Sequence, residues 1–224
     1  MNCLELTGRE RNHIQQFQNP RFAVQKDTAA AFLEMRAQAS KEGFQIHPVS
    51  SFRDFKTQLK IWNQKAKGER PLFGSDGKPL EFSKMTASEI LYAILGWSAL
   101  PGASRHHWGS EIDVIDLSKL KEGDQVELLP HEVLQGGSFF PMHQWLDEHA
   151  EKFGFFRPYK TDRDGVFPEL WHLSYAPISI KALGDLSQNL VSEVIKNNDI
   201  LLKELLLESL DVIYQRYIIN IDLP

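Results

Sequence analysis

Apolar residues recur every three or four positions in four stretches of the first 160 residues, which predicts four amphipathic helices. The predicted helices span residues 27–42, 54–67, 86–100 and 141–153. Asp27 and either Thr86 or Ser88 have side chains suited to cap helix starts, and Gly43 and Gly154 stand where two of the helices should end. These signals agree with the apolar spacing, so the helical assignments rest on two kinds of observation.

Stretches in which apolar and polar residues alternate predict strands between the helices. The predicted strands lie at residues 44–49, at 111–116, from residue 155 onward and at 170–175. Because strands and helices do not alternate regularly, we expect an α+β fold with a small antiparallel or mixed sheet flanked by helices, not a doubly wound one.

The last part of the chain has a different pattern. Leucine, isoleucine and valine spacing over residues 178–219 predicts two helices with a break near Asn197 and Asn198. No residue there suggests chemistry. We therefore divide the chain into a domain of residues 1–177 and a helical appendage of residues 178–224. The appendage is expected to pack on the domain or to pair with a second copy in a homodimer.

Composition narrows the function classes. The 224 residues include 25 Lys and Arg against 30 Asp and Glu, a net charge of −5. This balance gives no broad basic surface, so nucleic acid is not an expected partner. Cys3 is the single cysteine, which excludes an internal disulfide and a sulfur-ligated metal site. Any metal must bind to histidine and carboxylate side chains.

No stretch approaches the roughly 18 consecutive apolar residues of a membrane span, and the first residues lack the apolar core of a signal peptide. We therefore expect no membrane span and a cytoplasmic location for the chain as written. If a leader preceded this sequence, the location would instead be the periplasm or cell envelope.

Four residues have the chemistry of a hydrolytic metal site. His106 and Asp113 lie seven apart across Gly109, a residue that permits a tight turn onto the following strand. His172 follows Glu169 by three residues, and a zinc site that activates water needs three such ligands and an open position. Each residue alone also has a structural interpretation: His106 and His107 could form a hydrogen-bonded surface turn, and Asp113 could cap a loop or form a salt bridge to it.

His107 is the nearest competitor as a ligand. The remaining histidines are expected to have structural roles. They are His13, His47, His131, His143 and His149.

Two motifs around these residues resemble the LAS metallopeptidases, a family that includes VanY-type D-alanyl-D-alanine carboxypeptidases, VanX-type dipeptidases and the zinc fold of sonic hedgehog. The family pattern Ser-x-His-x-x-Gly-x-Ala-x-Asp is matched by SRHHWGSEID at residues 104–113. The pattern Glu-x-Trp-His-x-x-Tyr is matched by ELWHLSY at residues 169–175. A third element, Ser-x-Arg with a later Gln, corresponds to Ser51, Arg53 and Gln58. Together these elements cover about residues 50–175.

The resemblance implies that zinc is bound by His106, Asp113 and His172, and that Glu169 is the catalytic base. It also implies that Arg53 contacts the substrate near its scissile carbonyl or its terminal carboxylate. Both roles fit the chemistry of these groups.

Other positions of the motifs leave alternatives open. Gln58 and Ser104 either donate hydrogen bonds to the peptide or fix the local backbone. Glu111 stands where the family has a small alanine, and Asp54 replaces the usual serine after the arginine. Glu111 is either a hydrogen-bonding partner behind a ligand histidine or a solvent-exposed carboxylate.

The resemblance therefore predicts a zinc D,D-carboxypeptidase that acts on the D-Ala-D-Ala end of peptidoglycan stem peptides or precursors. L,D-carboxypeptidases, dipeptidases and L-Ala-D-Glu endopeptidases share this site, and the loops at residues 68–82 and 117–138 would choose among them. An alternative of another class is a non-hydrolytic zinc module like hedgehog, although the presence of Glu169 beside an open metal position argues for catalysis.

Overall fold

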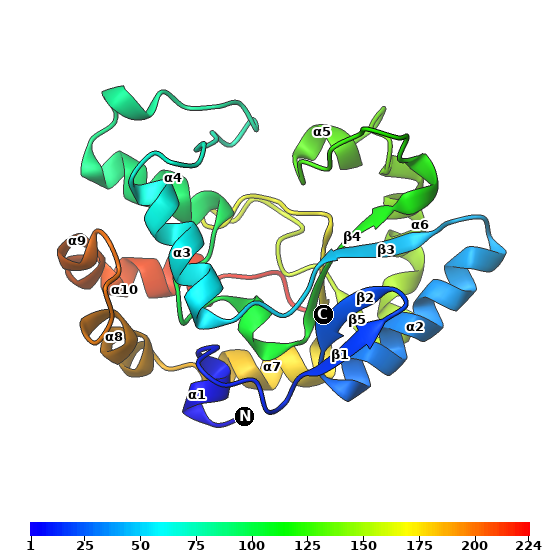
Figure 1. Cartoon of the computed structure of the whole chain (residues 1–224), viewed down its shortest axis with the longest axis horizontal. Coiled ribbons are helices and arrows are strands. Elements are labelled where there is room, and N and C mark those ends of the chain that lie inside the picture. Colours follow the sequence, from blue (N-terminus) through cyan, green and yellow to red (C-terminus); the bar gives the residue numbers. More distant parts are fainter.

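The computed structural model describes all residues, 1–224, and its main feature is a four-stranded sheet of order β3-β4-β6-β5. Every neighbouring pair in the sheet is antiparallel. The strands are β3 (Ile46–Ser50), β4 (Glu111–Asp116), β5 (Phe155–Phe156) and β6 (His172–Tyr175). The predicted α+β class is confirmed, with an antiparallel sheet flanked by helices (Figure 1).

The helices that flank the sheet begin close to the predicted residues. They are α2 (Lys26–Lys41), α3 (Phe55–Ala66), α4 (Ala87–Trp97) and α6 (Phe140–His149). The Asp54 side chain accepts the Thr57 N–H at 2.7 Å and so caps α3, which explains the acidic residue after Arg53. Thr86 caps α4 in a capping box. The predicted cap Asp27 is wrong, because α2 already begins at Lys26 and Gln25 is its N-cap residue.

A two-stranded hairpin, β1 (Gln15–Gln18) with β2 (Arg21–Val24), was not predicted from the sequence. Its first strand reads QQFQ and contains a single apolar residue, so it carries no clear alternation. The second strand buries Phe22 and Val24 against the same core as the main sheet.

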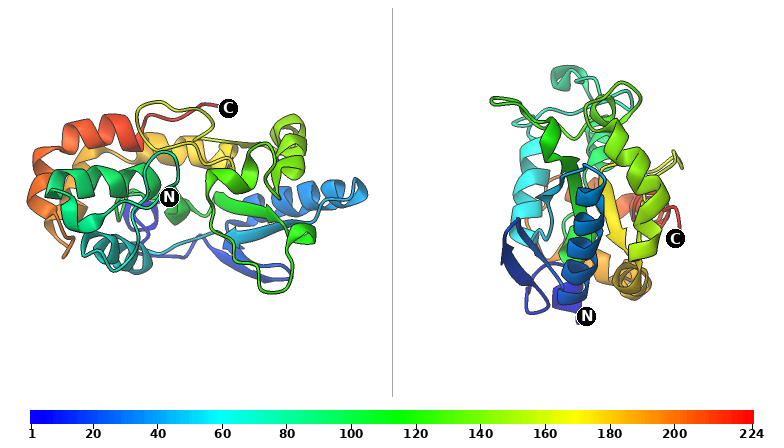
Figure 2. Two further views of the ribbon diagram at one scale, coloured as in Figure 1. Left: turned by 90° about the horizontal axis from the view of Figure 1, so that it is seen from above. Right: turned by 90° about the vertical axis from the view of Figure 1, so that its right-hand side faces the viewer.

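Two hydrophobic cores divide the molecule into two lobes. One core lies between the sheet and helices α2 and α6, and includes Phe32, Ile112 and Trp145. The other is helical and brings Trp62 of α3 and Leu91 of α4 together with residues of the C-terminal helices. Figures 1 and 2 show the helical lobe on one side of the sheet lobe.

The C-terminal segment forms more helices than the two predicted. They are α7 (Ala176–Asp185), α8 (Gln188–Lys196), α9 (Lys203–Glu208) and α10 (Leu210–Ile213), followed by a π turn (Tyr214–Ile218). A first break comes before Asn197, because Ser187 accepts the Leu190 N–H and starts α8. Leu206 and Ile213 are buried in the helical core, and the Trp62 indole donates to the Leu201 carbonyl at 3.0 Å. The segment shares this core with α3 and α4, while its division from a domain of residues 1–177 and its pairing in a homodimer stay predictions.

Short elements complete the chain. They are α1 (Cys3–Leu6), α5 (Pro130–Val133) and 3₁₀ turns at Phe82–Lys84, Arg105–Trp108, Leu117–Lys119 and Ala150–Phe153. No helix combines the length and apolar character that crossing a bilayer requires.

Candidate metal and active site

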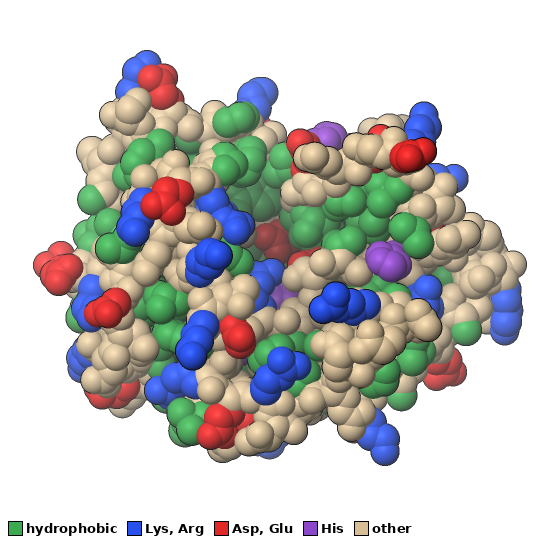
Figure 3. Space-filling view, viewed as in Figure 1, with side chains coloured by type: hydrophobic (Ala, Val, Ile, Leu, Met, Phe, Trp, Pro, Cys, Tyr) green, Lys and Arg blue, Asp and Glu red, His purple; other side chains and the backbone are tan.

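A cleft of about 260 Å³ opens where the two lobes meet. Figure 3 shows it as a hollow near the centre of the face, with acidic side chains at its floor and basic ones along one margin. Its walls come from α3, the end of α4, strands β4 and β6, and the loops at residues 127–129 and 159–171. His106, Asp113, Glu169 and His172 all line it, so the cleft is the candidate site.

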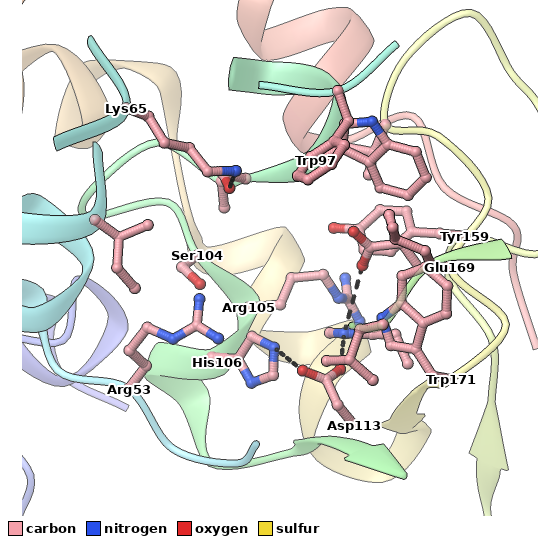
Figure 4. A pocket seen from close by; sticks show the side chains of 18 of the residues that line it. Arg53, Lys65, Trp97, Ser104, Arg105, His106, Asp113, Tyr159, Glu169 and Trp171 are labelled. Atoms are coloured by element: carbon pink, nitrogen blue, oxygen red, sulfur yellow. Dashed lines mark hydrogen bonds and ion pairs between the residues drawn. The ribbon is translucent and has the colours of Figure 1, made fainter. Parts of the chain in front are cut away.

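At the floor of the cleft lie His106, Asp113 and His172, whose ligand atoms are all within 4.8 Å of one another (Figure 4). Asp113 of β4 and His172 of β6 are direct partners in the antiparallel register. His106 comes from the preceding 3₁₀ turn, which ends at Gly109 with φ +66°. A Cβ on Gly109 would lie 2.3 Å from Ile14 Cδ1, so the predicted turn requires glycine here.

The hydrogen bonds of the two histidines turn one nitrogen of each toward the group. His106 Nδ1 donates to the Ser51 carbonyl at 2.8 Å, which leaves Nε2 at 3.4 Å from Asp113 Oδ2. His172 Nε2 contacts Glu111 Oε2 at 2.7 Å, and its Nδ1 lies 2.9 Å from Asp113 Oδ1. Nε2 of His106 and Nδ1 of His172 therefore face the same point as the Asp113 carboxylate.

Glu111 is fully buried behind His172, so the solvent-exposed alternative for this residue is wrong. Its carboxylate also accepts hydrogen bonds from Ser110 Oγ at 2.8 Å, from Ser174 Oγ at 2.9 Å and from Arg105 Nε at 3.3 Å. Burial by itself would raise the pKa of Glu111, but Arg105 and His172 outweigh it and lower the pKa to about 2. Glu111 is thus a fixed anion at neutral pH.

The charged groups around His172 keep the Asp113 carboxylate ionised. Burial alone would disfavour the charged forms of both Asp113 and His172. The pKa of Asp113 is nevertheless lowered by His106 and His172, and hydrogen bonds to Asp113 and Glu111 raise the pKa of His172 to about 10. Without a metal, an imidazolium at His172 therefore balances the Asp113 charge, and a bound cation would take the place of its Nδ1 proton.

Glu169 lies beside this group at the start of the last motif. Its N–H donates to the Tyr159 carbonyl and its own carbonyl accepts the His172 N–H, which fixes the turn before β6. Glu169 Oε2 lies 3.9 Å from His172 Nδ1. Burial and the nearby Asp113 raise the pKa of Glu169 to about 7, a value at which a carboxylate can both accept and deliver a proton near neutral pH.

Arg53 lines the cleft next to His106, and its N–H donates to the His106 carbonyl at 3.1 Å. Its guanidinium donates to Gln58 Oε1 at 2.9 Å and to Ser50 Oγ at 3.0 Å. Gln58 in turn donates to the Ala99 carbonyl at 2.7 Å, is fully buried and does not line the cleft. The structure thus places Gln58 behind Arg53, whereas Ser104 does line the cleft.

His107 points away from the metal group, and both of its ring nitrogens are engaged by backbone. Nδ1 donates to the Arg53 carbonyl at 2.6 Å, and Nε2 accepts the Gly102 N–H at 3.1 Å. Burial lowers the pKa of His107 to about 3, so the ring is neutral. Of the two adjacent histidines, His106 is the one that can hold a metal.

Several cleft residues were not predicted from the sequence. Lys65 and Arg70 lie on the α3 side, and the Tyr159 ring lies with its centroid 5.3 Å from that of His172, tilted by 52°. Trp97 and Trp171 stack with ring centroids 6.2 Å apart and form the opposite wall. Trp171 lies within the motif at residues 169–175. Lys65 on a helix and Trp97 near a helix end, in contrast, have no sequence context that predicts a place in a cleft.

Comparison with known proteins gives matches over most of the chain. The family model described as VanY, D-alanyl-D-alanine carboxypeptidase, matches residues 21–178. An uncharacterized protein of Haemophilus influenzae is 34% identical over 122 residues, which cover 54% of this chain and 93% of that protein.

Two solved structures share the fold. One is VanYB in complex with D-Alanine-D-Alanine, with a TM-score of 0.55, 19% identity and coverage of 85% of this chain and 91% of that one. The other is a mutant of the D,D-pentapeptidase VanY from a VanB-type vancomycin resistance cassette in complex with Zn(II), with a TM-score of 0.53 and 22% identity. It covers 75% of this chain and 82% of that one.

Proposed function

This chain belongs to the VanY family of D-alanyl-D-alanine carboxypeptidases, and on that basis we propose that it is a zinc-dependent D,D-carboxypeptidase. The substrate is a peptidoglycan stem peptide or precursor, from which it removes the terminal D-Ala. The solved relative that holds D-Alanine-D-Alanine supports this choice of substrate.

The donor set in the cleft fits zinc. His106, Asp113 and His172 offer two imidazole nitrogens and one carboxylate oxygen within 4.8 Å of one another, a ligand combination typical of catalytic zinc. Calcium and magnesium prefer sites built from oxygen ligands, which this group does not supply. Both imidazoles are also oriented by hydrogen bonds from the other ring nitrogen, to the Ser51 carbonyl and to Glu111. When bound, zinc would polarise the scissile carbonyl and lower the pKa of water.

Glu169 is the proton carrier of this proposal. Its carboxylate lies at the edge of the metal group and has a pKa of about 7, so at neutral pH a large fraction is ionised. It takes a proton from the attacking water and delivers that proton to the nitrogen of the leaving D-Ala.

Arg53 holds the substrate next to the metal group. Gln58 and Ser50 fix its guanidinium, so little conformational freedom is lost when the arginine meets the peptide. A fixed cation at this position stabilises negative charge that develops on the scissile carbonyl oxygen. Ser104, in the same lining, supplies a neutral hydrogen bond to the peptide.

The observation that carries the proposal is the buried His-Asp-His group with Glu169 beside it in an open cleft. The test is incubation of the zinc-loaded protein with defined muropeptides, followed by mass analysis. Loss of one terminal D-Ala from a pentapeptide stem is the expected result. Release of a dipeptide, a cut in the middle of the stem or trimming of tetrapeptides alone would assign the site to one of the sister specificities, and no cleavage would favour the non-hydrolytic zinc module.

A further inference from the structure

The α3 side of the cleft carries three cations that have no carboxylate partner. Arg53, Lys65 and Arg70 all line the cleft, and none of them forms an ion pair within the protein. Arg105 of the same cleft, in contrast, is neutralised by Glu111. The uncompensated positive charge is therefore confined to one wall, which Figure 4 shows opposite Glu169 and Trp171.

Lys65 is held in the cleft wall by a single side-chain hydrogen bond. Its ammonium donates to Ser98 Oγ at 2.7 Å and has no other hydrogen-bonding partner, so two of its three N–H donors are free. Burial, with Arg70 and Arg53 nearby, lowers its pKa to about 8, while Glu169 acts in the opposite direction. Holding an unpaired ammonium in such a place is unfavourable, and an incoming anion would remove the penalty.

Arg53 and Lys65 occupy different parts of this wall. Arg53 donates its backbone N–H to the His106 carbonyl and interacts with the charge of Asp113, which does not act on Lys65, so Arg53 lies toward the reacting centre. Lys65 is tied to Ser98 at the end of α4, farther along the wall (Figure 4). A peptide whose scissile carbonyl is held at Arg53 therefore meets a second, separate cation.

We propose that Lys65, supported by the charge of Arg70, is a specificity-determining residue that binds a carboxylate of the peptide, while Arg53 serves the scissile carbonyl. This inference rests on the proposed function, and it gives Arg53 and Lys65 different groups of the same peptide to bind. The carboxylate has two sources in a stem peptide, the C-terminal group of the leaving residue and a carboxylate within the stem. Charge-assisted hydrogen bonds of an ammonium to either have the same chemistry.

The experiment compares wild type, Lys65→Met and Lys60→Met. Lys60 is an exposed lysine of the same helix that does not line the cleft, which makes it a matched control. The probes are three pentapeptides: one with all carboxylates, one with a C-terminal amide and one with the internal stem carboxylate amidated. KM and kcat are measured for the zinc-loaded enzymes, and binding of the same peptides is measured in a Glu169→Gln background.

Lys65→Met should raise KM for the full peptide on the order of 10- to 100-fold with little change in kcat, and Lys60→Met should not. For the amidated peptide that lacks the carboxylate bound by Lys65, Lys65→Met should leave KM unchanged relative to wild type. That peptide shows whether the C-terminal or the internal carboxylate is the one bound. Equal losses for all three peptides, or an unchanged KM, would overturn the proposal. Failure of the proposed function gives a different result, since peptides would then bind in the Glu169→Gln background without being cleaved by wild type. Absence of binding by any peptide there would contradict the carboxylate subsite itself.

Discussion

Glu111 and His172 are joined by a 2.7 Å hydrogen bond from the imidazole Nε2 to a fully buried carboxylate. The other nitrogen of the same ring faces Asp113 at 2.9 Å. The ring is thereby held in one orientation with Nδ1 directed at the proposed metal position, although Glu111 stands where the family pattern has alanine. Such a partner both orients a ligand histidine and increases its basicity.

Replacing Glu111 by Gln should weaken zinc binding by about 10- to 100-fold, since the amide no longer offers an anion to the imidazole. Competition with a chromophoric chelator measures this affinity without reference to activity. Glu208→Gln, at an exposed helix position, is the control. Because the change leaves Arg105 buried without its partner, thermal unfolding of Glu111→Gln and of the double variant with Arg105→Met should be recorded in parallel. Wild-type affinity in a folded Glu111→Gln protein would contradict the role assigned here.

Glu169→Gln should keep stoichiometric zinc and lose hydrolysis by about 10²- to 10⁴-fold, because the amide cannot accept the proton of the attacking water. Metal analysis and initial rates on the same preparation test both halves of this statement. Unchanged activity in the variant would exclude Glu169 as the base.

His106→Ala should abolish tight zinc binding, whereas His107→Ala should leave it close to wild type. The His107 ring binds only backbone groups, so its loss leaves the Gly102 N–H unsatisfied and costs about 1–3 kcal/mol of folding stability. Zinc titration and chemical denaturation of both variants separate the two effects. Loss of zinc binding from His107→Ala alone would move the ligand by one residue.

The kcat/KM for the acidic substrate should fall as the pH rises through about 8. The pKa of Lys65 is lowered to about 8, so the ammonium is present below this pH and lost above it, which removes the cation that meets the carboxylate. Glu169, whose pKa is raised to about 7, is already largely ionised at this pH and does not produce this limb. Lys65→Arg, which stays protonated, should flatten the profile between neutral and alkaline pH. If kcat/KM of Lys65→Arg fell near pH 8 as it does in wild type, the titration would belong to another group.

The gathering of His106, Asp113, His172 and Glu169 in one cleft was predictable because these residues lie within short motifs whose spacing fixes their local geometry. The position of Glu111 was only partly predictable: the sequence left open whether its carboxylate lies behind a histidine or in solvent, and its burial depends on the pairing of β4 with β6, far along the chain. Lys65, Trp97 and Tyr159 reach the cleft only because the two lobes pack as they do, and no local pattern encodes that arrangement. The hairpin at Gln15–Val24 and the early break before Ser187 were missed for a related reason, since tertiary packing and a single cap outweigh weak periodicity there.

The register of β4 and β6 limits where insertions can be accepted during evolution of the protein. Asp113 and His172 face each other across the ladder, so inserting one residue in either strand would turn a ligand to the opposite face. Leu128 and Leu129, in contrast, reach the cleft from the long connection after β4, whose length no ladder fixes. Insertions and exchanges in that connection can therefore alter which peptide ends are accepted while the hydrolytic centre is inherited intact, and they are the natural targets for laboratory evolution of new peptide preferences.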